Sequence, residues 1–175
     1  MTNDDLPYFR DPLMQYVRYG SSGILVVLGG RIAGGDDAGF RQMNSIQVYD
    51  IAADNWSTQI ATEDSPLTGT TYCAAVSAAP HDSSKHLVLY GGWTNTQGVI
   101  DKHADKAGVY ILIMPAFHWI KINTAQVNGL SHTTDVRTGQ TCVAYKDRQL
   151  LVFGGNYNDT GHTCTSTFSP LRCST

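Results

Sequence analysis

Few of the reactive side chains in this sequence stand at spacings that catalysis or metal binding requires. His162, Cys164 and Cys173 offer three zinc-binding groups, yet they lack a fourth ligand and the paired spacing of zinc sites. The other five histidines, at positions 81, 86, 103, 118 and 132, are dispersed, without a paired carboxylate or a metal-ligand spacing. We therefore expect no catalytic residues, no metal site and no cofactor.

The stretch Gly30-Arg-Ile-Ala-Gly-Gly35 superficially fits a loop that cradles phosphate, because it is glycine-rich and follows an apolar run. No helical pattern comes after it, and no Gly-Lys-Ser or Gly-Lys-Thr is present. These residues are interpreted as an ordinary loop.

Two of the four cysteines, Cys73 and Cys142, stand at matching places in two similar segments, where small residues dominate. We expect them to be small buried thiols. Cys164 and Cys173 lie close enough in sequence to close a small loop if oxidised, but spacing does not decide whether they pair.

These residues lie within a repeat. Three apolar runs, 24–28, 87–90 and 150–153, each end in a glycine pair, and the second glycines stand at the near-constant spacing of positions 30, 92 and 155. Behind the first two pairs a second element recurs in phase, Val48-Tyr49 then Trp56, and Val109-Tyr110 then Trp119. Self-similarity at a fixed period predicts stacked structural units.

Each element of the repeat has a physical role in a small antiparallel sheet. The apolar runs fit strands that are buried on both faces. The small-residue segments before the glycine pairs, Thr71–Val76 and Thr141–Tyr145, suit inner strands near a crowded axis. From the residues alone, a β-sandwich with chance glycine pairs is the alternative architecture.

The repeat resembles the kelch repeat of β-propellers, and Arg137-Thr-Gly-Gln-Thr141 is similar to the motif that enters its inner strand. The segment at Thr68-Gly69-Thr70 lacks the arginine, and Ile113 stands where Asp50 would align. The resemblance implies an all-β fold, a kelch-type β-propeller fragment of about two and a half four-stranded antiparallel blades.

The expected organisation follows from the repeat. Residues 1–15 form an N-terminal extension, residues 16–155 form the blades, divided at about 16–66, 67–130 and 131–155, and the polar tail 156–175 is loop or disordered. Closed propellers usually have about four to eight blades. We therefore expect either a part of a larger propeller or self-association through the open blade edges.

Loops on one propeller face bind partners in kelch proteins, as the resemblance implies. The contact-capable side chains on these loops are Arg31, Asp36, Asp37, Trp93, Asn95 and Arg137. The first functional hypothesis is a non-catalytic module that binds another protein. The alternative is a fragment of a galactose oxidase-like copper radical oxidase, although no copper-ligand motif matches residue by residue.

Composition and charge limit the remaining classes. A net charge of −3 with scattered Lys and Arg argues against nucleic-acid binding. The apolar runs are far shorter than the roughly 18 residues of a membrane span, and the acidic start is unlike a signal peptide. Glycosylation sequons at Asn55 and Asn158 favour a secreted or cell-surface full-length protein. Asn55 is expected to be the poorer glycan acceptor, because the neighbouring Trp56 is expected to be packed.

Overall fold

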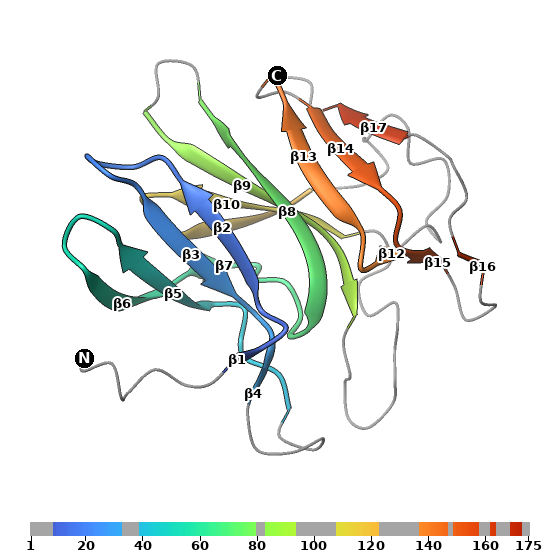
Figure 1. Cartoon of the computed structure of the whole chain (residues 1–175), viewed down its shortest axis with the longest axis horizontal. Coiled ribbons are helices and arrows are strands. Elements are labelled where there is room, and N and C mark those ends of the chain that lie inside the picture. The colour runs from blue at the N-terminus through green and yellow to red at the C-terminus, as the bar shows by residue number, and fades with distance from the viewer. Residues whose placement is uncertain are drawn as a thin grey trace.

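The computed structural model describes residues 9–32, 39–79, 83–93, 108–122, 137–146, 149–157, 162–163 and 169–172. Within these ranges every regular element is a β-strand (Figure 1). Three sheets lie side by side, and their inner strands β2, β8 and β13 are neighbours. The arrangement confirms the all-β blade architecture expected from the repeat.

The first blade is an antiparallel sheet with the strand order β2-β3-β5-β6. Its strands are β2 (Leu13–Val17), β3 (Ile24–Leu28), β5 (Ser45–Asp50) and β6 (Asn55–Ile60). The short strands β1 (Phe9–Arg10) and β4 (Arg31–Ile32) pair with each other beside it.

The second blade contains β8 (Thr70–Ala78), β9 (Lys85–Trp93), β10 (Val109–Met114) and β11 (His118–Ile122) in an antiparallel sheet. A fifth strand, β7 (Thr62–Glu63), pairs parallel to β11 at the outer edge. The chain leaving the first blade therefore adds to the edge of the second before it enters β8.

The third blade has the strand order β13-β14-β17 and contains β13 (Thr141–Tyr145), β14 (Gln149–Phe153) and β17 (Ser169–Arg172). A smaller sheet joins β12 (Arg137–Thr138), β15 (Asn156–Tyr157) and β16 (His162–Thr163). The sequence predicts loop or disorder over 156–175, whereas the structure pairs β17 with β14. A third strand needs only backbone hydrogen bonds to the free edge of β14, so it can form without an apolar period.

The three apolar runs occupy separate sheets, as expected. β3, β9 and β14 each lie between two antiparallel partners, so their backbone groups are paired on both sides. All six residues of the glycine pairs that follow have positive φ, between 57° at Gly29 and 101° at Gly92. At Gly92 a Cβ atom would also lie 2.3 Å from the Tyr72 ring, so both backbone conformation and close packing require glycine.

Two apolar cores fill the spaces between neighbouring blades. The first core joins the first two blades, and the second joins the second and third blades. Trp119 on β11 is fully buried in the first core, and its indole N–H donates a 3.2 Å hydrogen bond to the Met43 carbonyl. This contact fixes the outer part of the second blade onto the first blade.

Trp56 and Trp119 occupy equivalent register positions. Trp119 stands opposite Leu112 on β10, which in turn stands opposite Leu87, whereas Trp56 stands opposite Tyr49, which stands opposite Leu25. Leu25 and Leu87 are each four residues before the first glycine of their pairs. The equivalent placement expected for the two tryptophans is therefore confirmed.

The buried-thiol expectation for Cys73 and Cys142 was wrong, because the two residues form a disulfide with their Cα atoms 5.4 Å apart. Cys73 pairs with Tyr90, directly before its glycine pair, whereas Cys142 pairs with Val152, which lies two residues before its own. This one-residue offset turns the two side chains to opposite faces of their strands. Each cysteine consequently faces the other across the second core.

Candidate partner-binding surface

Arg31 lies directly after the first glycine pair, on β4, opposite Arg10 in the pairing with β1. The chain folds back on this strand, because Phe40 forms a β-bridge with Arg31 and the Arg41 amide donates to the Gly30 carbonyl at 3.0 Å. The loop between β4 and β5 thereby returns Phe40 to the side of Arg31.

Trp93 occupies the equivalent place in the second blade, at the end of β9 directly after Gly91 and Gly92. Its strand neighbour is Thr70 at the start of β8. The Thr70 hydroxyl donates to the Asp11 carbonyl at 2.6 Å, which ties this end of the second blade to the chain before β2. The loop regions of two blades meet here.

Arg31, Phe40 and Trp93 form a compact group, which we call the Arg31 cluster. The guanidinium carbon of Arg31 lies 5.7 Å from the Phe40 ring centroid and 5.0 Å from the Trp93 ring centroid. The two rings lie edge to face, with centroids 5.4 Å apart and planes inclined by 74°. The guanidinium therefore contacts two aromatic rings from different blades, a cation–π arrangement that holds it in place.

The Arg31 side chain has a hydrogen-bond donor for which the described part of the chain supplies no acceptor. Its Nε atom is buried and has no hydrogen-bond partner within the described residues. A guanidinium has five N–H donors, and stacking on aromatic faces leaves those in its plane free. Arg41, which follows Phe40 in the chain, is half-buried, and burial lowers the pKa of its guanidinium. Such a site is suited to an acceptor group from outside.

The structure brings together two of the six expected contact residues, Arg31 and Trp93. Asp36, Asp37 and Asn95 lie outside the described residues. Arg137 is placed by its backbone on β12, which lies beside β9. The structure therefore locates Arg137 near the strand that carries Trp93, while its side chain is outside the description.

The entry to the third blade is anchored by the motif that follows Arg137. Gly139 donates its amide to the Thr71 carbonyl at 3.2 Å, and Gln140 donates Nε2 to the Tyr90 carbonyl at 2.9 Å. Gln140 is buried, and its Oε1 atom has no hydrogen-bond partner among the described residues. These contacts give the motif a scaffold role between the second and third blades.

Phe40 is the member of the cluster that the sequence does not single out. A signal was available, because Phe40 is the sole aromatic residue in the glycine-rich segment 31–43. An aromatic side chain in such a segment indicates a place where the loop packs against something. Sequence spacing does not predict that this loop folds back onto Arg31.

The described part of the chain contains no group of three or more His, Cys, Asp or Glu side chains that could hold a metal ion. It also contains no helix with the length and apolar character needed to cross a membrane. The copper oxidase alternative and the expectation of no cofactor both stay predictions.

Comparison with known proteins supports the kelch resemblance. No protein-family profile matches the chain. A kelch repeat-containing protein of Arthroderma benhamiae is 33% identical over 148 residues, which are 83% of this chain and 20% of that protein. The chain thus spans about a fifth of the relative's length.

Two solved structures share the fold. A cryo-EM structure of RAG in complex with one melted and one unmelted RSS matches with a TM-score of 0.67 and 13% identity, over 94% of this chain and 51% of that one. The structure of YjhT matches with a TM-score of 0.50 and 14% identity, over 96% of this chain and 42% of that one. The chain is a kelch-type β-propeller segment, as its repeat predicts.

Proposed function

We propose that this kelch-type propeller segment is a non-catalytic protein-interaction module that binds its partner through the Arg31 cluster. The observation that carries the proposal is the Arg31 guanidinium, which contacts two aromatic rings from different blades while its buried Nε has no partner within the described residues. Arginine and tryptophan are enriched among the residues that dominate binding energies at interfaces.

The chemistry of the cluster indicates what the partner presents. Guanidinium N–H groups bond most strongly to carboxylates, and they also bond to backbone carbonyls. Because the two rings already restrict the Arg31 side chain, less conformational entropy is lost when a partner binds. The partner segment therefore offers an oxygen acceptor to Arg31 and an apolar group to the neighbouring rings.

Selection from a random-peptide phage library tests the proposal, with the immobilised chain as bait. We expect the wild-type chain to enrich peptides that share one position at which the side chain offers an oxygen acceptor, such as a carboxylate. Arg31→Ala should weaken their affinity by about tenfold or more, as expected of a residue that dominates an interface. Arg31→Lys should also weaken binding, because an ammonium lacks the planar donor geometry.

Arg18→Ala provides the matched control. Arg18 is exposed beyond the far end of β2, away from the glycine-pair loops, so its truncation should leave peptide affinity unchanged. Circular dichroism and urea denaturation of each variant separate lost binding from lost folding. Peptides that bind wild-type and Arg31→Ala equally, or a selection without enrichment, would contradict the proposal.

A further inference from the structure

Strand β6 begins, directly after the turn that follows β5, with the sequon Asn55-Trp56-Ser57. Asn-X-Ser is an acceptor sequence for N-linked glycans when the chain passes through the secretory pathway. The sequence disfavours Asn55, because the neighbouring Trp56 is expected to be packed. The structure shows where Asn55 and Trp56 lie.

Asn55 is exposed, as are all four residues of the turn 51–54 before it. The turn is held by local contacts, since the Asp50 carboxylate accepts hydrogen bonds from the amides of Ala52 at 2.9 Å and Ala53 at 3.0 Å. Asn55 stands opposite Asp50 in the last pair of the hairpin. Its side-chain amide is therefore accessible at the tip of the hairpin.

Packing of Trp56 does not cover Asn55. Trp56 lies against the Tyr49 ring, with the two centroids 5.0 Å apart. Successive side chains of a strand point to opposite faces, so a tryptophan packed on one face leaves the preceding asparagine on the other. The reason for disfavouring Asn55 is thereby removed.

The Cys73–Cys142 disulfide supplies a second and independent observation. Structural disulfides persist in oxidising compartments, and the secretory pathway is the compartment of this kind in which N-glycans are added. The bond joins inner strands of two blades, β8 and β13, and neither cysteine belongs to the sequon. Cysteine pairing and the exposed sequon thus indicate the same compartment without depending on each other.

We propose that Asn55 is an N-glycosylation site. In the transfer, the side-chain amide nitrogen of Asn55 attacks the anomeric carbon of a lipid-pyrophosphate-linked oligosaccharide. A carbon–nitrogen bond forms, the bond between that carbon and the phosphate oxygen breaks, and the lipid pyrophosphate leaves. The amide proton passes to a base of the transferase, and the Ser57 hydroxyl completes the recognised sequence.

The position suits a glycan. β6 is the outermost strand of the first blade among the described residues, and a bulky polar group beside such an edge discourages pairing with other chains. The hairpin tip lies at the far end of β5 from Phe40 and Arg41, which precede that strand. A glycan on Asn55 would therefore leave the Arg31 cluster accessible.

The test expresses the chain behind a cleavable signal for the endoplasmic reticulum, with Asn158→Gln to remove the other sequon. Cell lysate and medium are both treated with peptide N-glycosidase, and the peptide that contains position 55 is examined by mass spectrometry. We expect a mobility shift on treatment and conversion of Asn55 to aspartate. Ser57→Ala, which keeps Asn55 itself, should abolish both signals.

Ser57→Thr makes the experiment decisive, because threonine sequons are generally better acceptors. The site is supported if Asn55 carries a glycan in the wild-type sequence and if the glycosylated fraction is higher in the Ser57→Thr variant. The proposal is overturned if Asn55 of the wild-type sequence is unmodified in both the cell lysate and the medium, whether or not the Ser57→Thr variant is modified. Thiol labelling of the same samples reports whether Cys73 and Cys142 are paired, so failure to oxidise is distinguished from failure to glycosylate.

Discussion

The two equivalent tryptophans show how one residue type acquires two energetic roles. Trp119 faces the first blade and is fully buried, whereas Trp56 faces the side of the first blade that no other described blade covers, and it is half-buried. The difference does not arise from their own strands, since both stand at the same register position. It arises from whether a neighbouring blade is present.

Truncation of the two tryptophans should therefore have unequal effects on stability. We expect Trp119→Ala to lower the free energy of unfolding by about 3 to 5 kcal/mol, as core aromatic truncations do, with loss of the bond to Met43 included. Trp56→Ala should lower it by about 1 to 2 kcal/mol, because less apolar area is withdrawn from water at that site. Urea denaturation followed by circular dichroism measures both values.

Trp119→Phe extends the test if the alanine variant does not fold. It keeps a ring in the core but leaves the buried Met43 carbonyl without its indole donor, a loss of about 1 to 3 kcal/mol. Equal destabilisation by the two alanine variants would contradict the difference in burial.

At the candidate site, sequence spacing singles out Arg31 and Trp93 as candidate contact residues. Both follow glycine pairs, and glycine pairs end strands at one place in every repeat. It did not predict that the two side chains meet, or that the Phe40 ring contacts the Trp93 ring. Those contacts depend on how far the first loop folds back and on the stacking of two blades. Neither quantity is encoded in a repeat period.

The inner strands show why a pattern of elements predicts more than a pattern of single residues. The small-residue segments correctly indicated strands β8 and β13, which lie side by side. The pairing of Cys73 with Cys142 depended on a one-residue difference in register between the two blades. Since one residue reverses the face on which a strand side chain lies, the approximate repeat phase predicted their strands but not their contact.

The disulfide should stabilise the junction between the second and third blades. It closes a chain segment with a sequence separation of 69, for which we expect a contribution of about 2 to 4 kcal/mol to the free energy of unfolding. Urea denaturation with and without a thiol reductant measures this contribution. The Cys73→Ala, Cys142→Ala double variant should match the reduced wild-type chain.

The same double variant serves as the control for the remaining cysteines. Its stability should not change when reductant is added, because the bond between the blades is absent. Cys164 and Cys173 are still present in this variant, so any contribution from them would remain visible. A reductant effect of equal size in the double variant would assign the stabilisation to another bond and contradict this account.

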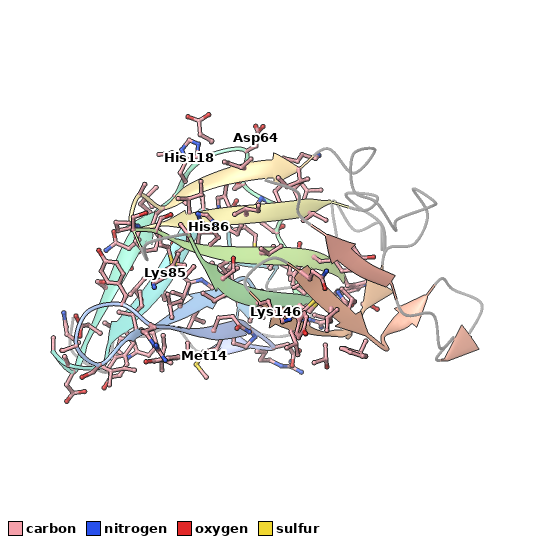
Figure 2. All side chains as sticks on the ribbon, turned by 90° about the horizontal axis from the view of Figure 1, so that it is seen from above. Met14, Asp64, Lys85, His86, His118 and Lys146 are labelled. Atoms are coloured by element: carbon pink, nitrogen blue, oxygen red, sulfur yellow. A yellow bond between two sulfur atoms is a disulfide. The ribbon has the colours of Figure 1, made fainter. Side chains whose placement is uncertain are left out.

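On the scale of the whole molecule, the described residues form three blades in an arc, and none of these residues covers the outer face of the blade at either end. On the first blade, Met14 and Tyr16 are 57% and 53% exposed, and Figure 2 shows Met14 pointing away from the other blades. On the third blade, Val143 and Tyr145 are 49% and 48% exposed on the strand face opposite Cys142. In the interior of the arc, the corresponding faces are buried in the two cores.

We propose that these two end faces are blade–blade contact surfaces, and that the isolated chain associates through them, because exposed apolar faces of this kind drive association in water. Multi-angle light scattering over a concentration series should show a mass above that of one chain. Met14→Glu combined with Val143→Glu should shift the distribution toward the monomer, because like charges on two facing surfaces repel each other. Both side chains are already exposed, so their replacement removes no core contact. Met14→Leu with Val143→Ile is the matched control and should still associate. A wild-type chain that stays monomeric at every concentration and unfolds cooperatively would show that the arc is stable with its end faces in water.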